Sequence, residues 1–201
     1  MRKPDQRRLT PGDWAQAALD AIARGGVEAV VVETIAGELG ATKGSFYWHF
    51  ANRDALIEAA VELWEQRRTE SVIEELDREP DPAVRLRNAM ELGIGRGPSN
   101  LAEVVLLANP AHPIARRAVR RVAKRRLEWC RDQLVALGWD EHEAHDRAVL
   151  FCHIYVGNMQ MTHLSPRLTS ATARERQVDL MFDFLVARAP SAGEVLPAGE
   201  G

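Results

Sequence analysis

Apolar residues recur at helical spacing along almost the whole of this 201-residue chain, and no segment shows the alternating pattern of a half-buried strand. The single β-branched run, Val30 to Val32, is too short for a strand and lies between helical segments. Glycine and proline groups at residues 95–100, 109–113, 137–140 and 165–170 separate the longer helices. The sequence therefore predicts an all-α protein of about nine helices.

The first 53 residues predict three short helices. Thr10 caps the first, which two glycines end at residues 25 and 26, and the second covers residues 33–39. Thr42 caps the third, which extends to about residue 50. Because only Gly40 and Ala41 join the second helix to the third, the pair forms a helix-turn-helix, a unit whose second helix enters the major groove of DNA.

An aromatic cluster from Phe46 to Phe50 occupies this third helix. Phe46 and Phe50 are four residues apart and are expected to pack inward with Leu39, which leaves the side chains between them on the outer face. The capped start of the helix presents free backbone N–H groups to a phosphate oxygen. The predicted DNA contacts are Thr42, Lys43, Gly44, Ser45, Tyr47, Trp48, His49 and Arg53.

Two long helices near the C-terminus, over residues 140–164 and 172–188, are apolar on more than one side. A helix with one solvent-exposed face would not show this pattern. We expect the two helices to form a four-helix bundle with those of a second copy. The predicted interface residues are Phe151, Tyr155, Met159, Met161, Val178, Met181, Phe182 and Leu185.

A pocket for a small-molecule effector is expected among the inner helices of this larger region. The candidate residues are polar or polarisable: Met90, Trp129, Cys130, His153 and Asn158. A lone histidine on an apolar face is more often a core residue with its hydrogen bonds satisfied, so His153 has that explanation as well. The arginine-rich run over residues 115–129 could hold an anionic ligand such as an acyl-CoA, but the i, i+4 recurrence favours a solvated face.

Two other functions stay open from the residues alone. His142 and His145 lie among carboxylates one turn apart, as metal ligands of an enzyme can, although acidic residues also gather naturally in the first turn of a helix. Helix-turn-helix units also occur in proteins that never bind DNA, and an aromatic cluster at a helix end is often core. A ligand-binding or adaptor protein with a vestigial DNA module is therefore the third possibility.

Composition sets the remaining expectations. The net charge of -3, with 46% apolar and 27% charged residues, is ordinary for a globular protein. Cys130 and Cys152 have no metal-ligand or disulfide spacing, and no apolar run approaches the ~20 residues that span a bilayer, so we expect a cytoplasmic protein without membrane contact. The expected organisation is a basic arm (1–9), a DNA-binding domain (10–53), an effector-binding and dimerisation domain (54–189) and a disordered tail (190–201).

The segments AALDAIARGGVEAV (residues 17–30) and IAGELGATKGSFYWHFANRDAL (residues 35–56) closely resemble the TetR (tetracycline-repressor) family. The resemblance implies a homodimeric repressor, not an enzyme and without a metal or other cofactor, that binds a palindromic operator in double-stranded DNA and is released by a small-molecule effector. It assigns DNA contacts to the residues predicted above except Gly44. Val31 and Glu33 stand where many members have a capping threonine and, soon after, an arginine. A carboxylate near DNA is repulsive unless it accepts from a cytosine amine, so Glu33 is expected to turn aside or to narrow operator choice.

Overall fold

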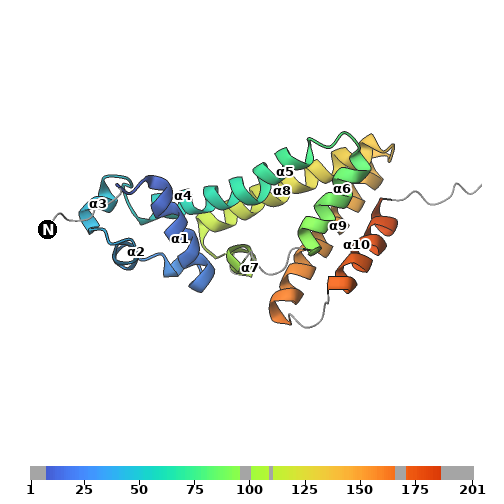
Figure 1. Cartoon of the computed structure of the whole chain (residues 1–201). Coiled ribbons are helices and arrows are strands. Elements are labelled where there is room, and N and C mark those ends of the chain that lie inside the picture. Colours follow the sequence, from blue (N-terminus) through green and yellow to red (C-terminus); the bar gives the residue numbers. More distant parts are fainter. Residues whose placement is uncertain (1–7, 96–100, 109–110, 166–170, 187–201) are drawn as a thin grey trace, which may run out of the picture.

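The computed structural model describes residues 8–95, 101–108, 111–165 and 171–186. These residues form helices and connecting turns without a strand, which confirms the predicted fold class. The molecule is elongated, with the three N-terminal helices at one end and the longer helices extending from them to the opposite end (Figure 1). Most of the expected arm (1–9) and the whole of the expected tail (190–201) lie outside the described residues.

Ten α-helical segments are present in the described residues. They are α1 (Pro11–Gly25), α2 (Val32–Glu38), α3 (Lys43–Tyr47), α4 (Arg53–Glu65), α5 (Ser71–Leu76), α6 (Pro82–Met90), α7 (Leu101–Ala108), α8 (Pro113–Ala136), α9 (Glu141–Leu164) and α10 (Ala171–Leu185). A 3-10 turn, η1 (Val27–Ala29), follows α1, and two π turns are η2 (Gln66–Glu70) and η3 (Glu91–Gly95). Because η2 joins α4 to α5 without a break, these two form one continuous helix, and the described helices then number nine, as predicted.

Caps and glycines predicted from the sequence set the limits of the first helices. The N–H of Asp13 donates to the Thr10 hydroxyl at 3.3 Å while the N–H of Thr10 donates to the Asp13 carboxylate at 2.8 Å, a capping box that starts α1. Gly26 and Gly40, at φ 75° and 63°, follow α1 and α2 in a conformation that favours glycine. Val31 precedes α2 and supplies no side-chain cap.

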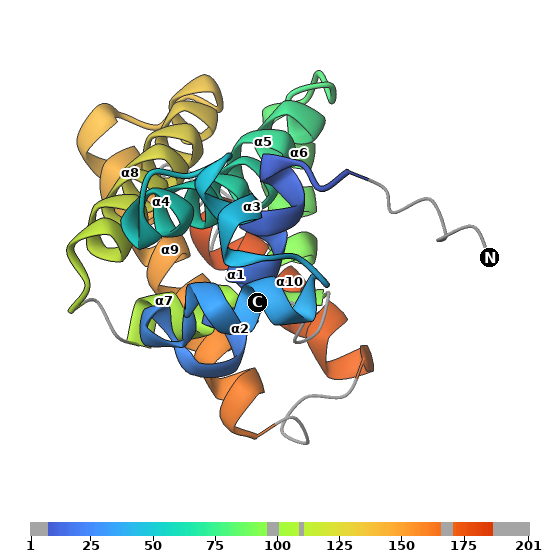
Figure 2. The same cartoon turned by 90° about the vertical axis from the view of Figure 1, so that its left-hand side faces the viewer.

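Helix α3 is shorter than expected, ending at Tyr47 instead of near residue 50. The chain leaves the helix because Asn52 must be extended to cap α4, where its side-chain oxygen accepts from the N–H of Ala55 at 2.9 Å. The N–H of His49 consequently donates to the Phe46 carbonyl in a tight turn at 2.9 Å. Viewed from that end of the molecule, α2 and α3 lie nearest the viewer (Figure 2).

Two hydrophobic cores hold the helices together. The first joins α1 to α4 with residues from the N-terminal half of α8, such as Ala118 and Val122, and with Leu106 of α7. The second lies among α5, α6, α8, α9 and α10. Since α4 is buried in the first core through Leu56, Ile57 and Trp64, there is no break in packing at the expected domain limit of residue 53.

Candidate nucleic-acid interface and internal cavity

Phe46 anchors the third helix to the first core. Its side chain is fully buried, and its ring centroid lies 5.6 Å from that of Trp14 and 5.8 Å from that of Phe50. A helix of only five residues cannot be stable by itself in water, so this packing holds α3 in place. Phe46 and Phe50 thus point inward as predicted, while Tyr47 and Trp48 are 56% and 87% exposed.

The outer surface of α3 gathers seven of the eight predicted DNA contacts. Thr42, Lys43, Gly44, Tyr47 and Trp48 are exposed, and Ser45 and His49 are half-buried. The Thr42 hydroxyl accepts from the N–H of Ser45 at 3.2 Å and so caps the helix. Among the described residues, a Cβ built on Gly44 would come within 4 Å of the Thr42 hydroxyl alone, at 3.6 Å, so the space in front of this residue is open to a close partner.

Lys43 is held by a carboxylate of the preceding helix. Its ammonium lies 2.5 Å from the Glu33 carboxylate, and both side chains are exposed. The hydrogen bond from Lys43 lowers the pKa of Glu33, and the same bond raises the pKa of Lys43. Glu33 therefore neutralises the one lysine of α3, and a nucleic acid that contacts Lys43 has to displace it.

Arg53 is oriented differently from the sequence prediction. Its Nε donates to the Val30 carbonyl at 2.7 Å, and its Nη2 donates to the Val27 carbonyl at 2.8 Å and to Glu28 at 3.1 Å. The side chain fastens η1 to the start of α4 instead of projecting toward a phosphate. The sequence places Arg53 in the first turn of α4 but does not show that carbonyls from more than 20 residues earlier lie beside it.

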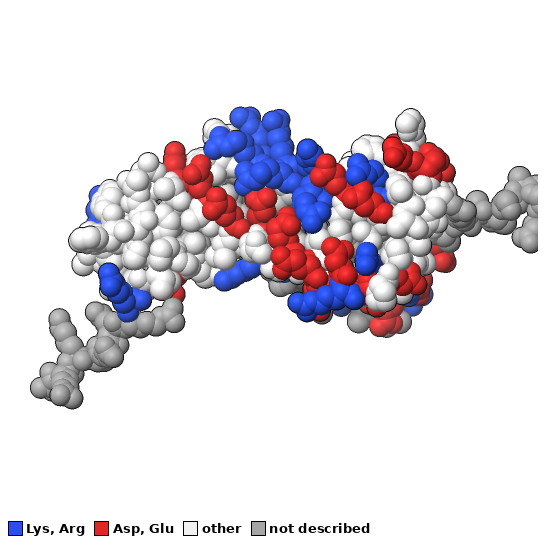
Figure 3. Space-filling model, turned by 90° about the horizontal axis from the view of Figure 1, so that it is seen from above, with Lys and Arg blue, Asp and Glu red and all other residues white. Residues whose placement is uncertain are grey.

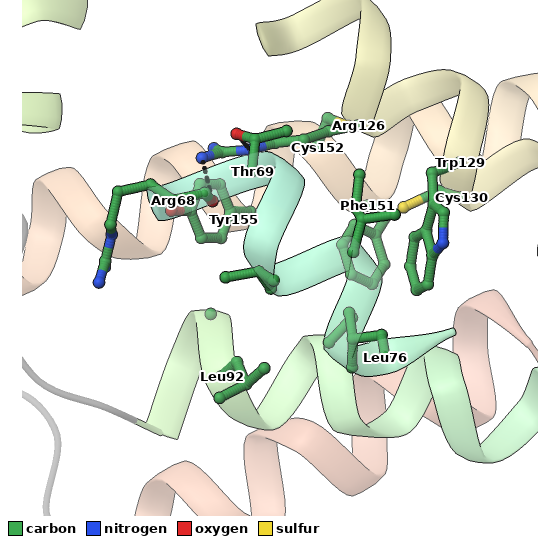
Figure 4. Close-up of a pocket in the computed structure, with 14 residues that line it drawn as sticks. Arg68, Thr69, Leu76, Leu92, Arg126, Trp129, Cys130, Phe151, Cys152 and Tyr155 are labelled. Carbon is green, nitrogen blue, oxygen red and sulfur yellow. Dashed lines mark hydrogen bonds between the residues drawn. The ribbon is translucent and has the colours of Figure 1, made fainter. Parts of the chain in front are cut away.

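A cavity of about 170 Å³ lies beside the second hydrophobic core (Figure 4). Its walls come from η2 and α5, from α6 and η3, and from the facing sides of α8 and α9. The lining residues are Arg68, Thr69, Val72, Ile73, Leu76, Ala89, Leu92, Gly93, Arg126, Trp129, Cys130, Phe151, Cys152 and Tyr155. Trp129 and Cys130 are the two predicted pocket residues among them.

A buried charged cluster forms the polar end of this cavity. Glu103 of α7, only 1% exposed, accepts from Arg126 Nη1 at 2.5 Å and from the Tyr155 hydroxyl at 3.2 Å. Arg126 also donates to the Thr69 hydroxyl at 3.1 Å and to the Arg68 carbonyl at 3.0 Å. Burial alone would lower the pKa of Arg126, but the charge and hydrogen bond of Glu103 outweigh it and raise the pKa. Burial and the same carboxylate raise the pKa of Tyr155.

Three of the predicted pocket residues lie elsewhere. Met90 is 1% exposed in the second core without lining the cavity, His153 is exposed on the outside of α9, and Asn158 does not reach the walls. The sequence did not indicate Arg126 and Tyr155 as cavity residues. Arg126 lies inside an arginine-rich run that has the pattern of a solvated face, and Tyr155 lies on a helix face that was predicted to form the dimer interface. A π turn such as η2, which places Thr69 at the cavity, has no recognisable sequence signal and is often found at functional sites.

The faces of α9 and α10 also differ from the prediction. Phe151 and Tyr155 line the internal cavity, whereas Val178, Met181 and Leu185 are buried in the second core of the same chain. Phe182 packs against that core beneath the Arg87 guanidinium, Met159 is half-buried, and Met161 alone of the predicted interface residues is exposed. The exposed apolar residues of these helices, here called the α9–α10 apolar face, are Leu150, Ile154, Met161, Leu164, Leu180 and Phe184.

The arginine-rich surface of α8 is largely paired. A band of basic side chains lies beside a band of acidic ones across the middle of the molecule (Figure 3). Arg121 contacts Glu65 at 2.7 Å, and Arg125 contacts Glu70 at 3.3 Å. These contacts fasten α8 to the α4–η2 helix, so most of the run is a solvated, salt-bridged face, as the sequence favours.

The described residues also bear on metal binding and on membrane insertion. Within these residues no group of three or more His, Cys, Asp or Glu side chains is arranged to hold a metal ion, and His142 and His145 are both exposed. No helix in the described parts of the chain has the length and apolar character needed to cross a membrane.

Comparisons with known proteins agree with the geometry of the N-terminal helices. Residues 16–60 match the family model of bacterial regulatory proteins of the tetR family. No curated protein sequence gives a significant match to the chain. A helix-turn-helix transcriptional regulator is the class that the fold and the exposed helix α3 define. Residues 16–60 thus form an N-terminal DNA-binding domain of the TetR type.

Solved structures share the fold over nearly the whole chain. A transcriptional regulator from Rhodococcus sp. Rha1 has a TM-score of 0.74 at 22% identity, with 88% of this chain and 96% of that one covered. A regulator from Saccharomonospora viridis in complex with choline has a TM-score of 0.74 at 18% identity, covering 89% and 98%. AibR in complex with isovaleryl coenzyme A and operator DNA has a TM-score of 0.66 at 19% identity, covering 88% and 97%.

Proposed function

We propose that this protein is a ligand-responsive repressor that binds a palindromic operator as a homodimer and leaves it when a small molecule enters the internal cavity. The observation that carries the proposal is the exposed surface of α3, which Phe46 anchors from behind. Residues 10–53 supply the DNA contacts in this proposal, and residues 54–189 supply the effector cavity and the dimer interface. The similar fold of AibR, whose structure contains operator DNA and isovaleryl coenzyme A, supports the same division of tasks.

The size of the cavity indicates the class of effector. An engineered protein cavity of roughly 150 Å³ with an apolar lining binds benzene, and the volume here is about 170 Å³. The walls are mainly apolar, and the polar end carries Arg126 and the Tyr155 hydroxyl. We therefore expect a compact, largely apolar molecule with one polar group directed at these two side chains.

Helix α7 offers a route from the cavity to the DNA-binding end. Glu103 binds the charged cluster at the cavity, while Leu106 on the same helix lies in the first core beside α1. A ligand that takes the Tyr155 hydroxyl from Glu103 alters the position that α7 prefers, and with it the packing against α1. The ligand weakens DNA binding only to the extent that it binds the shifted arrangement of α7 more tightly than the arrangement that binds DNA.

The α9–α10 apolar face is the proposed dimer interface. Apolar surface that is contiguous and exposed marks interaction sites on soluble proteins. Gly157 lies on the same face of α9, and a Cβ added there would have no atom of a neighbouring element within 4 Å among the described residues, so a helix of a second copy can approach closely. A dimer provides the second copy of α3 that a palindromic operator requires.

Selection of genomic DNA fragments with the purified protein, followed by footprinting of the enriched fragments, tests the proposed function. We expect a small set of fragments that share a palindromic sequence, protected in two adjacent halves. Protein that enriches no fragment even at low salt would contradict operator binding and favour the adaptor alternative.

Two substitutions in α3 separate the proposed roles of its side chains. Lys43→Ala is expected to weaken operator binding roughly tenfold and to change sequence preference, since Lys43 lies where base edges are reached. Tyr47→Phe removes a phosphate donor and should weaken binding to all sequences alike. Fluorescence anisotropy with operator and scrambled duplexes measures both effects.

Glu33→Gln is the matched variant for Lys43→Ala. It releases the ammonium of Lys43 and removes a negative charge, so affinity should rise and depend more steeply on salt. Equal, sequence-blind losses for Lys43→Ala and Tyr47→Phe contradict the role assignments, as does a loss of affinity in Glu33→Gln.

Phe184→Glu is expected to convert the dimer to a monomer and to abolish operator binding at concentrations at which the parent protein binds. The phenylalanine side chain is 66% exposed, so the charge is solvated in the free chain but would be desolvated in the proposed interface. Val84→Glu, at a position 38% exposed on α6 and outside the apolar face, is the control. Analytical ultracentrifugation reports the mass, and a dimer that survives Phe184→Glu rules out this interface.

A further inference from the structure

The two cysteines of the chain meet at the same cavity. Cys130 lies on α8 and is 2% exposed, whereas Cys152 lies on α9 and is half-buried. Both are free thiols, and both belong to the cavity wall. Figure 4 shows the helices that carry them crossing beside Arg126 and Phe151. Two thiols on facing helices at one small cavity form a different kind of site from a single buried cysteine.

The surroundings give the two thiols different chemical characters. The interaction with Cys130 lowers the pKa of Cys152, burial opposes this, and the positive charge of Arg126 lowers the pKa further. The same interaction and burial raise the pKa of Cys130. Cys152 is therefore the thiol that ionises more readily, and the thiolate is the reactive form of cysteine.

Access also distinguishes the two thiols. Cys152 lines the cavity between Phe151 and Tyr155, so a small, largely apolar reagent in the cavity lies beside its thiol. Cys130 lies deeper in the core but next to Cys152, where it can reach a modified sulfur at that position. A reactive cysteine with a neighbouring resolving cysteine is the arrangement found in redox-responsive proteins.

We propose that a small hydroperoxide entering the cavity oxidises Cys130 and Cys152 to an intramolecular disulfide that links α8 to α9. In the first step, the Cys152 thiolate attacks the terminal oxygen of the hydroperoxide. The O–O bond breaks, the alcohol leaves with a proton, and Cys152 becomes a sulfenic acid. In the second step, the Cys130 sulfur attacks the Cys152 sulfur, the S–O bond breaks, and water leaves with the Cys130 proton. Two thiols are oxidised by two electrons, and the hydroperoxide is reduced to an alcohol and water.

The disulfide would act on the DNA-binding end through α8, a consequence that rests on the proposed function. The N-terminal half of α8 lies in the first core, and its Arg121 and Arg117 contact Glu65 and Glu58 of α4. A covalent bond at Cys130 fixes α8 against α9 one turn from Arg126, whose contacts hold η2 and α7. We expect oxidation to lower operator affinity by about 5- to 150-fold, the usual range for coupling between two sites.

Intact full-length protein treated with hydrogen peroxide provides the first test, which needs no DNA. Thiol titration and mass spectrometry should show both thiols lost together with the mass of two hydrogen atoms, a linked Cys130–Cys152 peptide, and reversal by dithiothreitol. In Cys130→Ser, oxidation should stop at a sulfenic acid on Cys152 that a 1,3-diketone reagent traps. In Cys152→Ser, Cys130 should stay reduced at the same peroxide dose.

Three results would overturn the thiol chemistry: disulfides between chains, preferential reaction of Cys130, or a reaction of Cys152 no faster than in the denatured chain. The second test measures operator affinity of reduced and oxidised protein, with Cys130→Ser as the control that cannot form the disulfide. A disulfide that leaves affinity unchanged removes the regulatory consequence while the chemistry and the proposed function both stand. Reduced protein that binds no operator contradicts the proposed function. The peroxide test of the thiol chemistry is independent of that result, because it uses no DNA.

Discussion

Replacing Phe46 by alanine is expected to lower the free energy of unfolding by about 3–5 kcal/mol and to abolish operator binding. The side chain is fully buried, with its ring against Trp14 and Phe50, and it is the residue by which the five-residue helix α3 is attached to the first core. Its removal leaves a cavity that α1 and α4 cannot close without moving. Urea unfolding followed by circular dichroism gives the loss of stability.

Trp48→Ala is the control that separates folding from binding. The Trp48 side chain is 87% exposed, so its removal should change the free energy of unfolding by no more than about 0.5 kcal/mol. Operator affinity should nevertheless fall, because the side chain lies on the proposed DNA surface. If Trp48→Ala destabilises the protein as much as Phe46→Ala does, the inward and outward division of the aromatic cluster is wrong.

Arg126→Met is expected to destabilise the protein by about 3–5 kcal/mol. The cost arises at Glu103, which is 1% exposed and loses its salt bridge to the Arg126 guanidinium, because removing one partner of an ion pair from a buried carboxylate is strongly destabilising. The Thr69 hydroxyl and the Arg68 carbonyl lose a donor as well. Thermal and urea unfolding measure this loss of stability. The loss should be smaller when the Glu103 carboxylate is replaced as well.

The double variant Glu103→Met with Arg126→Met provides that comparison. Replacing a whole buried ion pair by apolar side chains of similar size is often neutral, so the double variant should be clearly more stable than Arg126→Met alone. Arg120→Met, at an exposed position of the same helix, should change stability by no more than about 0.5 kcal/mol. A double variant no more stable than the single one would show that the buried charge of Glu103 is not the cause.

The N-terminal helices could be predicted from the sequence because their signals are local. A capping box joins residues three apart, Gly40 fixes a turn by its own backbone freedom, and Asn52 caps the helix that follows it directly. The four-residue spacing of Phe46 and Phe50 likewise determines which side of α3 is buried. Each of these features depends on residues within one or two turns, so the surface proposed to meet DNA followed from the order of the residues.

The cavity and the exposed faces of the long helices were decided by the tertiary structure. Helices α9 and α10 are apolar on several sides, and periodicity cannot tell which side meets the chain's own core and which stays exposed. Within one arginine-rich helix, Arg126 is half-buried and turned toward Glu103 of α7, while Arg120 is exposed. Arg53 binds carbonyls more than 20 residues earlier, and Cys130 meets Cys152 across two helices. These partners are distant in sequence, so only packing of the helices against one another brings them together.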